Sequence, residues 1–243
     1  MMASDTPAGA TAEKERVPPT TGANRPTPAT ILLALLPTLA FLGIMVWAYG
    51  DVERFFEHPA RLGMVVATVL MTILALFSGS SGLGSGQRED RSNRWIFAPL
   101  LLLSVVLAWL PPYLDGRGLW TLDQPIVPYI GLVLFVLGGV LRLAPVFALG
   151  WRFSGLVAIQ HGHRLKTDGL YRFVRHPSYA GLLVNCTGLV LIFRCWLGLF
   201  LIIGILAILL ARIKAEEALL ASTFGEEYDA YRRRTWRLVP WLY

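Results

Sequence analysis

The stretch YAGLLVNCTGLVLIFRCWLGLFLIIGILAILLA, residues 179–211, is almost entirely apolar. A helix that crosses a bilayer needs only about 20 such residues, so this stretch is too long for a single span. Arg194, Cys195 and Trp196 interrupt it near the middle. We therefore predict a helical hairpin of two helices, each of about 16 residues and joined at Arg194, which must tilt or lie in a thin part of the bilayer.

Four more apolar blocks lie upstream of this predicted hairpin. They cover about residues 30–49, 61–77, 95–110 and 126–149. The pair Pro111-Pro112 follows the third block and is expected to end that helix. Only 16% of all residues are charged, against about 25% in soluble domains. The pattern predicts an all-α, polytopic membrane protein with about four transmembrane helices, the C-terminal hairpin and a cytosolic amphipathic helix.

Three parts of the chain differ in composition. Residues 1–29 are rich in Pro, Thr, Ala and Gly and are predicted to form a disordered tail. Residues 30–140 are assigned to transmembrane helices 1–4, and residues 141–243 carry most of the polar motifs.

The number of Lys and Arg residues alternates between high and low in successive loops between the apolar blocks. Cation-rich loops of membrane proteins face the cytoplasm, so both termini and the segment 169–181 are predicted on that side. This rule accounts for the net charge of +6. A nucleic-acid partner is therefore not expected.

The segment GLYRFVRHPSYAG, residues 169–181, is the most polar and turn-rich stretch next to the hairpin. Proline disfavours the α conformation for the preceding residue and suits the first turn of a helix, so a helix is predicted to begin at Pro177. Its free backbone N–H groups could bind an anion such as a carboxylate. A plain helix start with Tyr179 at the membrane interface explains the same pattern.

Residues 212–234 combine strong helix formers with an apolar stripe at helical spacing. A helix that leaves the membrane and lies along its surface is predicted, with a break near Gly225. The stripe consists of Ile213, Leu220, Phe224, Tyr228 and Tyr231.

Three charged residues lie where apolar helices end. Arg212 and Glu216 are four residues apart and share one helix face, either as an ordinary ion pair or as part of a ligand site. Arg142 lies near the end of the fourth block, where it either extends its charge to the interface or has a functional partner.

The sequence does not indicate a metal site. His161 and His163 are two residues apart, but no Cys or Glu lies at a matching spacing. Cys186 and Cys195 fit neither a zinc site nor a disulfide framework and are interpreted as packing residues.

Three motifs, taken together, resemble the isoprenylcysteine carboxyl methyltransferase family. They are LRLAPVFALGWRFS at 141–154, HRLKTDGLYRFVRHPSYAG at 163–181 and, after the hairpin, RIKAEEALLASTFGEEYDAYRRRTWRLVP at 212–240. Members of that family are integral membrane enzymes that use S-adenosylmethionine. The resemblance makes residues 141–243 the methyltransferase core, with a cofactor pocket on the cytosolic side between the loop and the C-terminal helix.

The resemblance also implies individual roles. Arg212 would hold the methyl acceptor, Glu216 would bind the cofactor, and these two would be the catalytic residues. Gln160 could make a further cofactor contact. The other residues expected to line the cofactor are His163, Arg164, Leu165, Lys166, Tyr171, His176, Pro177, Ser178 and Tyr179.

The expected reaction is methyl transfer from S-adenosylmethionine to a lipophilic or lipidated acceptor, foremost the carboxylate of an isoprenylcysteine-like compound. Membrane lipids are the other expected partners. A thiol, amine or phospholipid acceptor would require the same cofactor motifs. An NADPH-dependent membrane reductase of the sterol-reductase type and a non-catalytic membrane scaffold are the alternatives from other classes.

Overall fold

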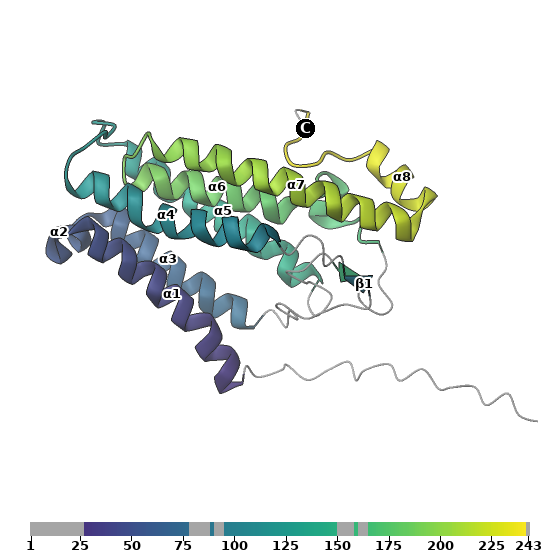
Figure 1. Cartoon of the computed structure of the whole chain (residues 1–243), viewed down its shortest axis with the longest axis horizontal. Coiled ribbons are helices and arrows are strands. Elements are labelled where there is room, and N and C mark those ends of the chain that lie inside the picture. Colours follow the sequence, from purple (N-terminus) through teal and green to yellow (C-terminus); the bar gives the residue numbers. More distant parts are fainter. Residues whose placement is uncertain (1–26, 78–87, 90–94, 150–157, 160–164, 242–243) are drawn as a thin grey trace, which may run out of the picture.

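The structure is a computed structural model, and it describes residues 27–77, 88–89, 95–149, 158–159 and 165–241. Long helices dominate the described part, and they pack into an elongated bundle (Figure 1). These helices are α1 (Pro28–Tyr49), α2 (Val52–Glu57), α3 (Pro59–Leu76), α4 (Phe97–Gly116), α5 (Val127–Leu149), α6 (Pro177–Ile192), α7 (Gly198–Phe224) and α8 (Glu226–Arg233). The shorter elements are a 3-10 turn, η3 (Gly169–Arg172), and two antiparallel strands, β1 (Arg88–Glu89) and β2 (Ala158–Ile159).

Five of the described helices, α1, α3, α4, α5 and α7, are long and apolar enough to cross a membrane. Helix α6 is apolar but has only 16 residues, and it forms the predicted hairpin with α7. The chain is therefore an integral membrane protein, as the apolar blocks predicted. The division into three parts by composition stays a prediction.

Two helix boundaries differ from the prediction. Helix α4 continues through Pro111 and Pro112 to Gly116, because Asp115 in its last turn is held by Arg61 and Arg194. Prolines in membrane helices are tolerated where neighbouring elements compensate for the lost backbone hydrogen bond.

Helix α7 has 27 residues, not about 16, because it continues without interruption out of the apolar block to Phe224. The predicted break does occur at Gly225, whose φ of 52° favours glycine. A short helix, α8, then begins at Glu226.

Helices α5 and α6 pack with their backbones in contact. A Cβ atom added to Gly138 would overlap the backbone of Asn185, and one added to Gly188 would overlap the backbone of Phe135. Asn185 Nδ2 also donates a hydrogen bond of 2.7 Å to the carbonyl of Phe135. Small residues and interhelical hydrogen bonds are the usual means of helix association in membranes. This contact places the start of α6 beside the end of α5.

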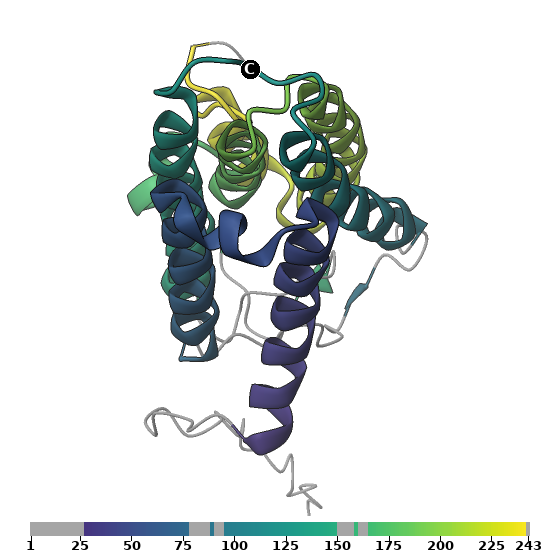
Figure 2. The ribbon, with the colours of Figure 1, turned by 90° about the vertical axis from the view of Figure 1, so that its left-hand side faces the viewer.

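The bundle has two distinct ends, and Figure 2 shows it with the end that carries α2 toward the viewer. At one end Asp115 of α4 contacts Arg61 of α3 and Arg194 of the α6–α7 turn. At the other end Arg212 of α7 lies over Phe97, at the start of α4. Successive helices therefore run in alternating directions, as a multi-pass membrane protein requires.

We expect Gly188→Ala to lower the free energy of unfolding by about 1–3 kcal/mol, because the new Cβ atom meets the rigid backbone of Phe135. Thermal unfolding of the purified protein in detergent measures the effect. Gly43→Ala in α1 is the matched control, because no atom lies within 4 Å of the added carbon. Equal unfolding temperatures for both variants would contradict this helix contact.

Candidate active site

Segments far apart in the sequence meet at the end of the bundle where α7 and α8 join (Figure 1). The residues after η3 pair with the C-terminal segment through backbone hydrogen bonds. Arg175 N donates to the carbonyl of Trp236 at 2.7 Å, and Trp236 N donates to that of Phe173 at 3.0 Å. The N–H of His176 donates to the carbonyl of Arg237 at 3.1 Å. The loop before α6 is thus fixed against the C-terminal segment.

Glu217 of α7 is the buried acid of this region. Its Oε1 accepts a hydrogen bond of 2.9 Å from Arg175 Nε, and its Oε2 accepts one of 3.0 Å from Arg237 Nε. His176 Nε2 lies 3.4 Å from Oε1. The side chain is only 6% exposed, so a lone charge there would be costly and paired cations stabilise it. Glu217 therefore joins α7 to both flanking segments.

The neighbouring Glu216 has a more open environment. Tyr179 Oη donates a hydrogen bond of 2.9 Å to its Oε2, and His176 Nδ1 lies 3.9 Å from the same oxygen. The side chain of Glu216 is 32% exposed. Its carboxylate can therefore still accept hydrogen bonds from a ligand.

Arg212 completes a chain of polar contacts with these residues. Its Nε donates a hydrogen bond of 2.6 Å to Tyr179 Oη, so the tyrosine hydroxyl lies between Arg212 and Glu216. The guanidinium carbon is 5.4 Å from the centre of the Phe97 ring. Arg212 is only 7% exposed, and a buried guanidinium beside an open carboxylate can orient an anionic group.

The start of α6 confirms the predicted helix entry. Helix α6 begins at Pro177, and His176 before it has the non-helical angles φ −123° and ψ 59°. The rings of His176 and Tyr179 stack at 5.6 Å. Ser178 Oγ donates a hydrogen bond of 3.3 Å to the carbonyl of Arg142, which links this entry to the end of α5.

Three tyrosines surround the cluster from the loop and from α8. Tyr231 Oη donates a hydrogen bond of 2.8 Å to the carbonyl of Tyr171. Burial, reinforced by the negative charge of Glu216, raises the pKa of Tyr171, and burial raises that of Tyr231 to about 12. Tyr228 Oη is buried and has no hydrogen-bond partner in the described part of the chain. All three hydroxyls therefore stay protonated at neutral pH.

The structure brings together four of the predicted site residues: His176, Tyr179, Arg212 and Glu216. Pro177 and Ser178 lie at the same helix entry. Tyr171 lies close enough to Glu216 for the negative charge of that glutamate to help raise the pKa of the tyrosine. Lys166 forms an ion pair of 3.0 Å with Asp168. Leu165 is half-buried beside it in the sequence. The predictions for Gln160, His161, His163 and Arg164 lie outside the described residues.

Sequence reasoning missed two residues of this region, Glu217 and Tyr228. The sequence did carry a signal for Glu217. The flanking segments contain the basic residues Arg175, His176 and Arg237, which need an acidic partner, and Glu217 is an acid next to Glu216. For Tyr228, the sequence showed only that it belongs to the apolar stripe of residues 212–234, which does not indicate a ligand contact. Among the described residues no group of three or more His, Cys, Asp or Glu side chains could hold a metal ion.

Comparison with known proteins gives a consistent result. Residues 130–222 match the model of the isoprenylcysteine carboxyl methyltransferase family. A probable protein-S-isoprenylcysteine O-methyltransferase of Oryza sativa is 31% identical over an alignment of 184 residues, and the match covers 72% of this chain and 96% of the relative. The methanethiol S-methyltransferase of Crocosphaera subtropica is 30% identical over 242 residues, covering 87% of this chain and 92% of that protein.

A solved structure of a eukaryotic intramembrane Ras methyltransferase of the same family also matches. It is 18% identical, covers 88% of this chain and 86% of its own, and superimposes with a TM-score of 0.45. The motifs and the full-length relatives give the family: this chain belongs to the isoprenylcysteine carboxyl methyltransferase family and is a methyltransferase.

Proposed function

We propose that this chain transfers the methyl group of S-adenosylmethionine to a lipophilic acceptor at the end of the bundle where α7 meets α8. The hydrogen-bonded chain Arg212–Tyr179–Glu216 carries the proposal. It presents a buried cation and a partly open carboxylate side by side, as a reaction between an anion and a sulfonium needs.

The residues present fit S-adenosylmethionine, which supplies an electrophilic methyl group on a positively charged sulfur. Glu216 can accept hydrogen bonds from its ammonium or hydroxyl groups, because a third of this side chain is exposed. The Oη of Tyr228, which has no hydrogen-bond partner among the residues that the structure describes, is a second polar atom for a ligand to satisfy. The other proposed cofactor residues are Leu165, Lys166, Tyr171, His176, Pro177, Ser178 and Tyr179, together with His163 and Arg164.

Arg212 is proposed to orient the acceptor. Its contact with Tyr179 fixes the guanidinium in a buried position, and guanidinium groups bind carboxylates with defined geometry. S-adenosylmethionine, when bound, would supply an electrophilic methyl group that the oriented acceptor oxygen could take, with the electrons of the carbon–sulfur bond staying on sulfur. No proton moves in this step, so positioning accounts for most of the rate. Opposite charges cancel, which a water-poor site favours.

The foremost acceptor is the carboxylate of an isoprenylcysteine-like compound, since the Oryza sativa relative is a probable protein-S-isoprenylcysteine O-methyltransferase. The membrane spans beside the site offer an apolar route for such a compound. A thiol is the second candidate, because a methanethiol S-methyltransferase matches along 92% of its own length.

We also propose that the site faces the cytoplasm. Many cationic side chains lie at the end of the bundle where α7 and α8 join. Loops rich in Lys and Arg stay on the cytoplasmic side of a membrane. The cationic side chains include Lys166, Arg172, Arg175, Arg232, Arg233, Arg234 and Arg237.

The pH dependence of the rate separates the two acceptors. A carboxylate is already ionised above pH 6, so methylation of a farnesylated cysteine derivative should change little between pH 6 and 8. The cysteine thiol has a pKa of about 8.5, and the pKa of a simple alkanethiol is higher. An alkanethiol is therefore mostly protonated over the same interval, and its methylation should rise about ten-fold per pH unit. Transfer of labelled methyl from S-adenosylmethionine measures both rates. Consumption of NADPH without transfer to either acceptor would instead support a reductase.

The two adjacent glutamates should respond differently to the same substitution. Glu216→Gln removes the open charge, so we expect at least ten-fold weaker binding of S-adenosylmethionine and an unchanged unfolding temperature. Glu217→Gln leaves Arg175 and Arg237 without their buried counter-charge, so it should lower the free energy of unfolding by about 3–5 kcal/mol. Calorimetric titration and thermal unfolding of both variants make the comparison. Wild-type cofactor affinity in Glu216→Gln would show that the assignment to Glu216 is wrong.

A further inference from the structure

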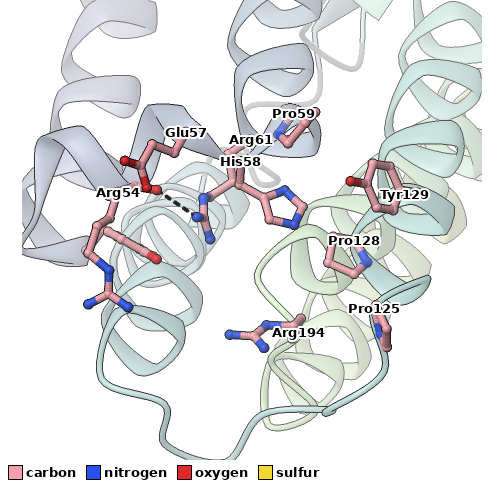
Figure 3. A pocket seen from close by; sticks show the side chains of 10 residues that line it. Arg54, Glu57, His58, Pro59, Arg61, Pro125, Pro128, Tyr129 and Arg194 are labelled. Carbon is pink, nitrogen blue, oxygen red and sulfur yellow. Dashed lines mark hydrogen bonds between the residues drawn. The ribbon is translucent and has the colours of Figure 1, made fainter.

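A cavity of about 480 Å³ lies at the end of the bundle opposite the candidate active site (Figure 3). Its volume is within the range of small-molecule sites, about 300–1,000 Å³. It lies between α2, the starts of α3 and α5, and the turn between α6 and α7. The side chains that line it are Tyr49, Arg54, Glu57, His58, Pro59, Arg61, Pro125, Pro128, Tyr129 and Arg194.

The inner wall of this cavity carries an excess of positive charge. The side chain of Asp115 is fully buried and binds Arg61 Nη1 at 2.9 Å and Arg194 Nη2 at 2.7 Å. Two guanidinium groups thus share one carboxylate. The Arg61 side chain is 8% exposed and that of Arg194 is 33% exposed, so Arg194 is the member that can reach a ligand.

Arg54 and His58 add two donors to the same space. Arg54 is exposed, and in the described part of the chain its guanidinium has no ion-pair partner. His58 Nδ1 accepts a hydrogen bond of 3.2 Å from the N–H of Ala60, so the neutral ring carries its proton on Nε2. Figure 3 shows the ring of His58 between Tyr129 and Arg61.

The acidic side chains nearby do not cancel this charge. Glu57 lines the cavity and is exposed. Asp123 lies 4.0 Å from Arg194, but its side chain is 84% exposed and water therefore screens it. Asp115 and Glu57 offset two of the three guanidinium charges, and the exposed Asp123 offsets Arg194 only weakly, so the cavity keeps a positive potential that suits an anion.

We infer that this cavity binds the phosphate group of a membrane phospholipid headgroup. Arginine is suited to phosphate because its planar fork makes paired hydrogen bonds. Large apolar side chains are exposed around the same end of the bundle, as at a membrane–water interface where headgroups lie. They are Trp47, Val52, Phe56, Leu119, Trp120 and Tyr129. The three prolines and two tyrosines of the lining give the glycerol backbone apolar walls.

Native mass spectrometry of the full chain in detergent tests this site. The probes are dihexanoylphosphatidylglycerol, dihexanoylglycerol, which lacks the phosphate, and inorganic phosphate. We expect the phospholipid to bind at least ten-fold more tightly than either of the others. Arg54→Gln should weaken phospholipid binding about ten-fold, because one charge-assisted contact is lost. Arg233→Gln is the matched control, since this exposed arginine lies in α8 at the opposite end.

Three results would overturn the inference. Equal binding of the phospholipid by Arg54→Gln and wild type would show that this cavity is not the site. Equal binding of dihexanoylglycerol would show that the phosphate is not recognised. Inorganic phosphate that binds as tightly as the phospholipid would overturn the assignment to a lipid and make free phosphate the ligand. Circular dichroism of Arg54→Gln checks that the variant is folded.

Discussion

The buried carboxylate of Glu217 holds together the end of the bundle where α7 and α8 join. It pairs with Arg175 before α6 and with Arg237 near the C-terminus, while it is itself part of α7. A buried ion pair gains little over an apolar contact, but breaking one leaves an uncompensated charge and is very costly. These ion pairs therefore favour the observed arrangement of the three segments, in which the charge of Glu217 is paired.

This arrangement gives the two neighbouring glutamates separate tasks. Both carboxylate oxygens of Glu217 pair with cations that fix the fold. One oxygen of Glu216 accepts a hydrogen bond from Tyr179, and its side chain stays partly exposed. Because the loop with His176 is fixed by Glu217, the stacked ring of Tyr179 is also fixed, and with it the hydroxyl that contacts both Arg212 and Glu216. The ion pair of the fold thus determines the position of the proposed catalytic residues.

Much of the fold could be predicted from the sequence, because a lipid bilayer restricts the length and the polarity of the helices that cross it. The apolar blocks predicted the membrane helices, Arg194 marked the hairpin turn and Pro177 marked the start of α6. The extension of α4 past its proline pair could not be predicted, since it depends on tertiary contacts of Asp115. The different tasks of Glu216 and Glu217 could not be predicted either. Adjacent residues of a helix point about 100° apart, and only the packing of the flanking segments decides which one is buried.

Photo-crosslinking with labelled S-adenosylmethionine, followed by peptide mapping of the full chain, tests the central claim most directly. If the cofactor binds at the end of the bundle where α7 and α8 join, we expect label in the loop and helix entry at residues 165–179 and on α7 or α8 at residues 212–231. Excess unlabelled cofactor should abolish this label. Specific label on α2 or on the turn around Arg194, at the opposite end of the bundle, would contradict the account.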